Sequence, residues 1–242
     1  MRAASTEAMF PVAILAGGLA TRMHPVTQTI PKSLIEVAGR PFIEHQLELL
    51  RAEGVKQVVL CVGHLGEMIE AHVGDGSRFG LSVRYSFDGE KLLGTGGALR
   101  RALPHLGQDF FVLYGDSYLE IAYALVQAVY RERGKPALMT VFRNEGKWDT
   151  SNVLFDGTDI IRYDKRHPTA DMKFIDYGLG VLNSDLLKAH NDDEAFDLSE
   201  IYAALAADGQ LAGFEATKRF YEIGTPSGLA VADGHLKGNQ PT

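Results

Sequence analysis

Short apolar runs alternate with amphipathic stretches through the first half of the chain, and this alternation limits the folds open to it. The run at 12–15 is apolar throughout, and similar runs lie within 55–63, 109–116 and 136–143. Between the first two runs, 41–54 places apolar residues at helical spacing and stops at a glycine. Strands separated by helices in this order predict right-handed βαβ units and a mainly parallel sheet. By the same criteria, further helices are predicted at 65–74, 94–106 and 122–134, and a further strand at 81–86.

The second half changes character. Residues 151–165 predict a β-hairpin, because Asp156 and Gly157 form a turn between two apolar stretches. Later segments predict a strand at 174–183, a helix at 199–209 and a strand-turn-helix at 221–236. No linker separates the halves. We therefore expect one α/β domain over 1–242, with a nucleotide-binding front (9–145), a rear that shapes a second pocket (146–237), and tails at 1–8 and 238–242.

The composition argues against several classes of protein. The net charge of −7 argues against broad binding to nucleic acid or to an anionic membrane. No stretch reaches the ~20 apolar residues that span a bilayer, and the first ten residues lack the apolar region of a secretory signal. Cys61 is the only cysteine, so no intrachain disulfide and no cysteine-built zinc cluster can form. We expect a buried Cys61 and a reducing, cytoplasmic setting.

The stretch "LAGGLATRMHPVTQTIPKSL" carries the strongest chemical signal. After the first strand, Gly17 and Gly18 allow the backbone to approach a ligand closely and to present N–H groups to an anion. Arg22 offers a planar fork for phosphate oxygens, and Lys32 follows a proline that restricts the local backbone. The pattern matches neither a Walker loop nor a dinucleotide fingerprint. It predicts a site for the triphosphate of a nucleotide.

At these residues the chain resembles the sugar-1-phosphate nucleotidylyltransferases, whose usual opening is L-A-G-G-x-G-T-R followed by P-K. The departure is Ala20, where the family usually has glycine. The resemblance implies a Rossmann-like, mainly parallel mixed sheet flanked by helices, of the nucleotide-diphospho-sugar transferase type. It implies that a nucleoside triphosphate and a sugar 1-phosphate are the substrates, that Mg²⁺ is the cofactor, and that a homodimer is possible.

Further along the chain, the resemblance assigns roles to individual residues. "EKLLGTGGALRRAL" is similar to the family's second nucleotide-binding segment, and "FVLYGDSYL" to the strand that ends in a metal-binding aspartate. With the opening motif, these segments imply a nucleotide site formed by Leu15, Ala16, Gly17, Gly18, Thr95 and Gly96. They also imply that Asp116 binds the metal. The catalytic set implied by the family is Arg22, Lys32, Asp116 and Lys165.

Three rear segments are similar to the family's sugar-binding half. "RYDKRHP" resembles its E-K-P segment, with an aspartate in place of the glutamate, and "SNV" stands where the family has Tyr-Gly-Val. "YEIGTPSGL" resembles the W-x-D-x-G-T close, so Glu222 stands in the position of the second metal ligand. The implied sugar-phosphate site comprises Asn152, Asp164, Lys165, Tyr177 and Gly178.

The implied reaction needs no general base, because a phosphate monoester with a second pKa near 6 is already a nucleophile at neutral pH. Two alternatives remain open from the sequence. One is a non-catalytic nucleotide-sugar sensor, suggested by Ala20 and Glu222. The other is a cytidylyltransferase for a non-sugar phosphate such as phosphocholine, for which aromatic residues are available at Trp148, Tyr163, Phe174 and Tyr177. Within the main interpretation, the chain looks most like heptose-1-phosphate guanylyltransferases and N-acetylmuramate-1-phosphate uridylyltransferases, and base and sugar stay open.

Overall fold

The structure is a computed structural model that describes residues 8–144, 146–148 and 150–238. Most of the tails predicted at 1–8 and 238–242 therefore lie outside the described residues. The strands are β1 (Val12–Leu15), β2 (Glu36–Val37), β3 (Arg40–Pro41), β4 (Gln57–Val62), β5 (Ser82–Phe87), β6 (Asp109–Tyr114), β7 (Ser117–Tyr118), β8 (Ala137–Arg143), β9 (Val153–Phe155), β10 (Ile160–Tyr163), β11 (Phe174–Asn183), β12 (Leu211–Ala216) and β13 (Tyr221–Glu222). The α-helices are α1 (Phe42–Ala52), α2 (Gly66–Val73), α3 (Gly94–Ala102), α4 (Tyr123–Arg133), α5 (Asp185–Lys188), α6 (Leu198–Ala207) and α7 (Pro226–Leu236).

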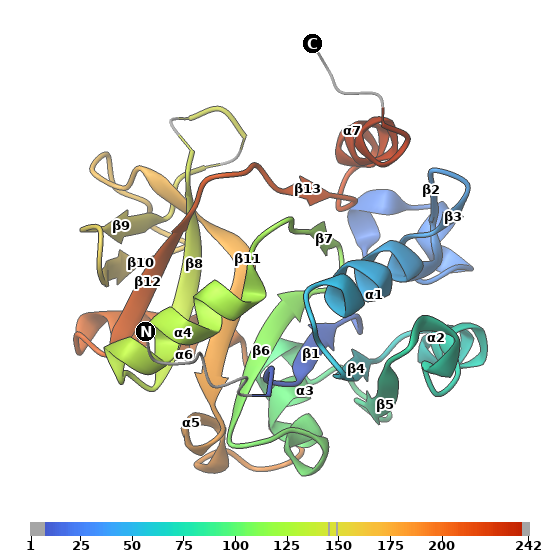
Figure 1. The fold of residues 1–242 in the computed structure, drawn as a ribbon, viewed down its shortest axis with the longest axis horizontal. Coiled ribbons are helices and arrows are strands. Elements are labelled where there is room, and N and C mark those ends of the chain that lie inside the picture. Colours follow the sequence, from blue (N-terminus) through green and yellow to red (C-terminus); the bar gives the residue numbers. More distant parts are fainter. Residues whose placement is uncertain (1–7, 145, 149, 239–242) are drawn as a thin grey trace, which may run out of the picture.

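A mixed sheet runs through the centre of the molecule (Figure 1). Its order is β10-β9-β11-β6-β1-β4-β5, and β8 pairs with both β11 and β12. β1, β4, β5 and β6 are parallel, as the alternation of the first half predicted. β11 runs antiparallel to both β6 and β8, which makes the sheet mixed. The hairpin predicted at 151–165 is confirmed by the antiparallel pair β9–β10.

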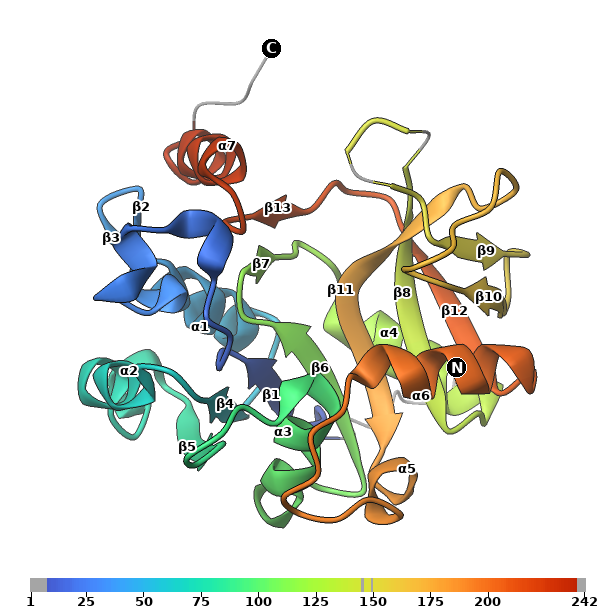
Figure 2. The ribbon, with the colours of Figure 1, turned by 180° about the vertical axis from the view of Figure 1, so that it is seen from behind.

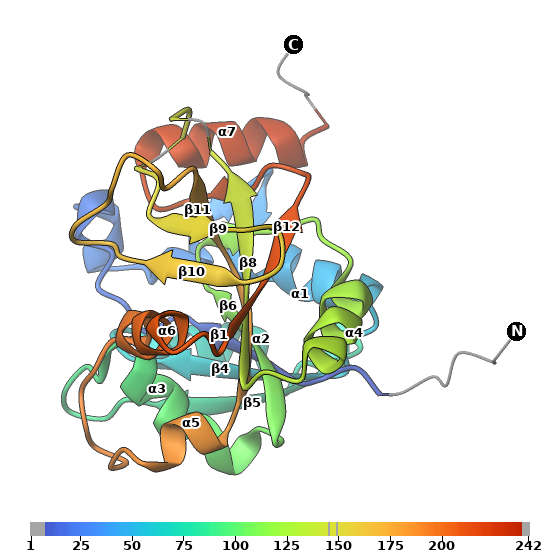
Figure 3. The same ribbon diagram turned by 90° about the vertical axis from the view of Figure 1, so that its left-hand side faces the viewer.

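Helices cover both faces of this sheet, and each face has its own apolar core (Figures 2 and 3). On one face, α1, α2 and α4 contribute buried residues such as Leu47, Ile69 and Val126. On the other face, α3, α5 and α6 contribute buried residues such as Leu99 and Tyr202. Because both faces are covered, the central parallel strands β1, β4 and β6 are largely apolar, whereas the edge strand β5 alternates between buried and exposed residues.

β12 is absent from the elements predicted above, and it pairs in parallel with β8. Its sequence, LAGFEA, has little of the β-branched content that marks a strand, and its place in the sheet comes from pairing with a distant segment. Across the described ranges, no helix is long and apolar enough to cross a membrane.

Candidate active site

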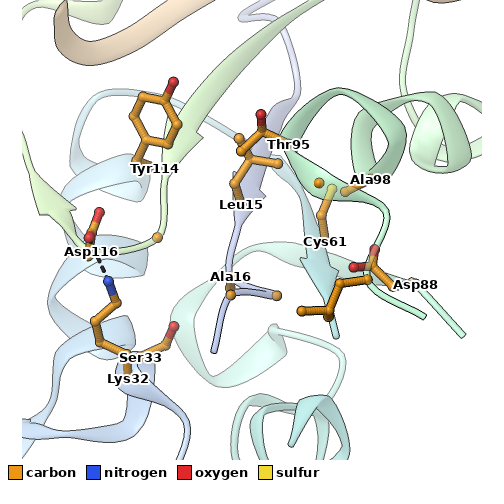
Figure 4. Close-up of a pocket in the computed structure, with 15 residues that line it drawn as sticks. Leu15, Ala16, Lys32, Ser33, Cys61, Asp88, Thr95, Ala98, Tyr114 and Asp116 are labelled. Carbon is orange, nitrogen blue, oxygen red and sulfur yellow. Dashed lines mark hydrogen bonds and ion pairs between the residues drawn. The ribbon is translucent and has the colours of Figure 1, made fainter. Parts of the chain in front are cut away.

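The carboxyl ends of β1, β4 and β6 meet at one edge of the sheet, and a cavity of about 220 Å³ lies there (Figure 4). It is lined by the glycine turn after β1, by the start of α3 and by the residues that follow β6. Of the residues predicted for the nucleotide site, the cavity brings together Leu15, Ala16, Gly17, Gly18 and Thr95, along with Lys32 and Asp116. Ligand sites at the carboxyl edge of a parallel sheet are the rule for this architecture.

Two glycines allow the segments around this cavity to approach closely. A Cβ at Gly17 would lie 2.9 Å from the backbone nitrogen of Gly63, which follows β4. A Cβ at Gly115 would lie 2.6 Å from the carbonyl oxygen of Leu15. Larger residues at either position would push the strand ends apart and change the shape of the cavity.

The turn after Gly18 holds Ala20 in the left-handed region, with φ 50° and ψ 43°. Its carbonyl oxygen accepts hydrogen bonds from the backbone N–H of Met23 (2.9 Å) and from the hydroxyl of Thr27 (2.9 Å). Glycine, which the resembled family usually has here, adopts a positive φ without strain. Alanine keeps the conformation at a cost in backbone energy.

Lys32 and Asp116 form an ion pair at one end of this cavity (Figure 4). The Lys32 Nζ lies 2.6 Å from the Asp116 Oδ2, and both side chains are about one-fifth exposed. Lys32 begins a 3-10 helix (Lys32–Leu34) directly after Pro31, and Asp116 follows β6. The proline and the strand end thus bring together two residues that are 84 positions apart in sequence.

A two-stranded pairing brings the second predicted metal ligand beside Asp116. β13 pairs with β7 so that Glu222 lies opposite Ser117, and the backbone N–H of Ile223 donates to the Asp116 carbonyl oxygen (3.0 Å). A Cβ built on Gly224 would lie 3.3 Å from the Asp116 Oδ2, 3.7 Å from the Glu222 Oε2 and 3.7 Å from the Arg22 Nη2. These two carboxylates and one guanidinium therefore converge on a single space that glycine leaves open.

This donor set fits Mg²⁺, which commonly binds one or two carboxylates and completes its coordination with substrate phosphates and water. Within the described ranges, no group of three or more His, Cys, Asp or Glu side chains could hold a metal. The Asp116–Glu222 pair therefore suits a metal that arrives with phosphate ligands better than an ion held by the protein alone.

A larger cavity of about 610 Å³ lies behind the first, and Tyr114 and Asp116 line both. It is walled by β11, β13, the segment after β10 that contains Lys165, and the start of α7. The residues predicted for catalysis, sugar phosphate and metal that line it are Arg22, Asp116, Asn152, Lys165, Tyr177, Gly178 and Glu222. Gly178 has φ 100° and lies at an irregularity in the β11–β8 pairing, which changes how the adjacent side chains are aimed.

Gly96 and Asp164, both predicted site residues, line neither cavity. Gly96 is buried in α3, where a Cβ would lie 2.2 Å from the ring of Phe196, so its small size serves packing. The Asp164 carboxylate accepts hydrogen bonds from the backbone N–H groups of His167 and Arg166, which lower its pKa. It thus stabilises its own turn, and the roles that the resemblance gave these two residues have no support in this geometry.

Two carboxylates that the sequence analysis did not single out line the cavities instead. Asp88 follows β5, is 6% exposed and lines the front cavity, at the opposite end from Asp116 (Figure 4). Its Oδ2 accepts from the backbone N–H of Leu93 (3.2 Å), and burial raises its pKa. Its position after a parallel strand was the available signal, because such positions meet at the ligand edge of the sheet.

Asp176 lines the rear cavity and belongs to β11. Its Oδ1 accepts from the backbone N–H of Gly178 (3.0 Å), and its Oδ2 accepts from the Tyr163 hydroxyl (3.3 Å). Burial raises the pKa of Asp176, while the nearby Lys165 ammonium acts to lower it. One acid in a largely apolar strand, "FIDYGLGVLN", was the signal for this residue.

Comparison with known proteins agrees with this geometry. A family model described as nucleotidyl transferase matches residues 12–232. The chain is 32% identical over 233 residues to N-acetylmuramate alpha-1-phosphate uridylyltransferase from Caulobacter vibrioides, which covers 92% of this chain and 95% of that protein. It is 28% identical over 219 residues to mannose-1-phosphate guanylyltransferase catalytic subunit beta from Danio rerio, covering 88% of this chain and 61% of that protein.

Among solved structures, HddC from Yersinia pseudotuberculosis complexed with GMP-PN superimposes with a TM-score of 0.79. The alignment covers 95% of this chain and all of HddC at 23% identity, which shows a shared fold. The family predicted from the opening motif is therefore confirmed: the chain belongs to the nucleotidyl transferase family, and its relatives include sugar-1-phosphate nucleotidyltransferases.

Proposed function

We propose that this chain transfers a nucleotidyl group from a nucleoside triphosphate to a sugar 1-phosphate, giving a nucleoside diphosphate sugar and pyrophosphate. The observation that carries the proposal is the junction of the two cavities at Asp116, with cationic side chains on both sides of it. Two phosphorylated substrates in these cavities would meet where Arg22, Asp116 and Glu222 converge.

The front cavity would hold the nucleotide. The turn at Gly17 and Gly18 offers backbone N–H groups to the triphosphate, and Lys32 and Arg22 supply positive charge where pyrophosphate leaves. Asp116 and Glu222 would hold Mg²⁺, which supplies charge that offsets repulsion between the two substrates.

The rear cavity would hold the sugar phosphate. Lys165 lines this cavity. Its Nζ lies 5.6 Å from the ring centroid of Tyr114 and 5.7 Å from that of Tyr163, so two aromatic rings position the ammonium group. An oxygen of the sugar phosphate attacks the α-phosphorus in line with the departing pyrophosphate. Since that phosphate is largely dianionic at neutral pH, the residues of this site serve to position and neutralise charge.

The aromatic faces of the rear half disfavour a quaternary ammonium substrate. Three of the four aromatic residues considered for phosphocholine have a cation over a ring face: Arg219 on Trp148, Arg143 on Phe174, and Lys165 on Tyr163. The fourth, Tyr177, is 2% exposed. A cage for a cationic ligand needs open aromatic faces, whereas these faces suit an anionic ligand beside the cations.

A coupled pyrophosphate assay tests the proposal, with each of the four common nucleoside triphosphates, Mg²⁺ and a panel of sugar 1-phosphates. We expect at least one pair to release pyrophosphate. We expect Asp116→Ala and Arg22→Ala to lose at least about a hundredfold in turnover, since one preorganised charge contributes on the order of 3 kcal/mol to the barrier. Arg133→Ala, on the exposed side of α4, is the matched control and should keep full turnover.

Nucleotide binding without pyrophosphate release from any pair would instead support the non-catalytic sensor. Normal turnover in Asp116→Ala would remove Asp116 from the proposed mechanism. Circular dichroism of each variant confirms that the fold is retained.

A further inference from the structure

The rear cavity contains more positive charge than the proposed reaction uses. Among the described residues, three basic side chains line it: Arg22, Lys165 and Arg219. Arg22 reaches the junction of the two cavities, and Lys165 lies beside Tyr114, which both cavities share. Arg219 lines the same cavity, but the three atoms nearest to a Cβ built on Gly224, where the reacting phosphates would meet, belong to Asp116, Arg22 and Glu222.

Arg219 is held by aromatic rings rather than by acids. Its Cζ lies 4.0 Å from the ring centroid of Trp148 and 4.7 Å from that of Tyr221. Its Nε donates to the carbonyl oxygen of Phe220 (3.3 Å). Neither Nη1 nor Nη2 has a hydrogen-bond or carboxylate partner among residues 8–144, 146–148 and 150–238. The plane of the guanidinium is thus fixed while its two terminal donors remain available.

Two other arginines stacked on aromatic rings, Arg78 and Arg143, have carboxylate partners. Arg78 lies over Phe79 and donates from its Nη2 to the Glu44 Oε1 (3.0 Å). Arg143 lies over Phe174, with its Nε 3.5 Å from the Glu215 Oε1. The chain has 31 acidic and 24 basic residues, so carboxylates are abundant. An arginine that lines a cavity without one is a candidate to bind a carboxylate brought by a ligand.

We propose that Arg219 binds a carboxylate carried by the sugar 1-phosphate, with Trp148 as the adjoining wall of this subsite. The inference rests on the proposed function and names the substrate class: acidic sugar 1-phosphates. The fixed guanidinium fork matches the planar, bidentate geometry of a carboxylate. At about 610 Å³, against about 220 Å³ for the front cavity, the rear cavity has room for a substituted sugar.

The test compares substrate pairs of which one member carries a carboxylate, as the oxidised C6 of glucuronate or within the lactyl ether of N-acetylmuramate. Glucuronic acid 1-phosphate pairs with glucose 1-phosphate, and N-acetylmuramate 1-phosphate pairs with N-acetylglucosamine 1-phosphate. For the wild type, we expect kcat/KM to favour the acidic member of at least one pair by about 10- to 100-fold. In Arg219→Met this ratio should fall close to one. In Arg143→Met, which removes a stacked arginine outside both cavities, the ratio should equal that of the wild type.

Trp148 provides a second readout, because it is the only tryptophan of the chain and lies against Arg219. Titration with the preferred acidic sugar 1-phosphate should change its fluorescence in the wild type and in Arg143→Met. The same titration of Arg219→Met should require at least about tenfold more ligand for half the change. This measurement needs no turnover.

Three results would overturn the inference: a wild-type ratio near one for both pairs, a preference that persists in Arg219→Met, or an equal loss on both members of a pair. The last result would mean that Arg219 binds the phosphate that both members share. Failure of the proposed function is distinguishable, because it would appear as no pyrophosphate release with any neutral or acidic sugar phosphate.

Discussion

At the scale of single residues, Ala20 is a point where the sequence and the preferred backbone conformation disagree. Its φ of 50° is unfavourable for a residue with a Cβ, by roughly 1–2 kcal/mol, and glycine avoids that cost while losing more freedom on folding. We expect Ala20→Gly to raise the free energy of unfolding by about 0.5–1 kcal/mol in denaturant titrations. Ala128→Gly, on the exposed side of α4, should lower the free energy of unfolding by about 1 kcal/mol. The same substitution therefore changes the stability in opposite directions at the two sites.

Asp88 supports a residue-scale prediction about the nucleobase. Its carboxylate is buried at the end of the front cavity opposite Asp116, and one oxygen already accepts from Leu93. A carboxylate there accepts from ring N–H groups, which guanine and uracil carry and which adenine and cytosine lack. We expect GTP or UTP to be preferred, and Asp88→Asn to lower that preference by roughly 10- to 100-fold in kcat/KM. An unchanged ranking of the four nucleotides in the variant would contradict this role.

At the scale of elements, the β7–β13 pairing brings the metal ligands together, and Gly224 keeps the space between them open. Gly224→Ala would place a methyl group 3.3 Å from the Asp116 Oδ2, at the point where metal and phosphates are expected. We predict at least about a hundredfold loss of turnover with an unchanged circular dichroism spectrum, since charge stabilisation here depends on exact placement. Gly107→Ala, whose Cβ would meet only the Asp109 carbonyl oxygen at 3.7 Å, is the control and should retain turnover.

The elements that sequence predicts well are those with a clear local pattern. β1, β4, β5, β6 and the helices between them agree with their predicted ranges, because each buries a continuous or periodic apolar set. β7 and β13 contain two residues each and depend on pairing between segments about 100 positions apart. No local pattern specifies such strands, although the motif around Glu222 predicted that this segment reaches the site.

The site shows the same division between local and long-range information. Gly17, Lys32, Asp116 and Lys165 stand in recognisable motifs, and each lines a cavity. Asp176 and Arg219 stand in no such motif. Burial raises the pKa of Asp176, and Arg219 stacks on Trp148, a neighbour that only the fold brings close. Gly96 shows the converse, because its motif position is also a packing position against Phe196.

At the scale of the whole molecule, one sheet supports two cavities that share Tyr114 and Asp116. The front strands are parallel and end at the nucleotide cavity, while antiparallel β11 carries residues of the rear cavity. The change from parallel to antiparallel pairing beside β6 therefore coincides with the change from one substrate site to the other. The single-domain organisation, the homodimer and the cytoplasmic setting stay predictions.

This arrangement predicts that metal and nucleotide bind cooperatively. In the structure, Lys32 neutralises Asp116 at 2.6 Å, so Mg²⁺ alone must compete with an ammonium group. A triphosphate in the front cavity offers Lys32 another anionic partner and offers the metal further oxygen ligands. We expect Mg²⁺ alone to shift the melting temperature little, and Mg²⁺ with the preferred nucleotide at 100 times its Kd to add about 2.7 kcal/mol of stability.

For a chain of this size, that stabilisation corresponds to a rise of roughly 5–10 °C, which a thermal-shift assay resolves. The coupling appears as a shift with both ligands that exceeds the sum of the shifts with each alone. In Lys32→Met, Mg²⁺ alone should give a larger shift than in the wild type, because the competing ammonium is gone. Equal Mg²⁺ shifts in the two proteins, or additive shifts in the wild type, would show that the Lys32–Asp116 pair does not control access of the metal to this carboxylate.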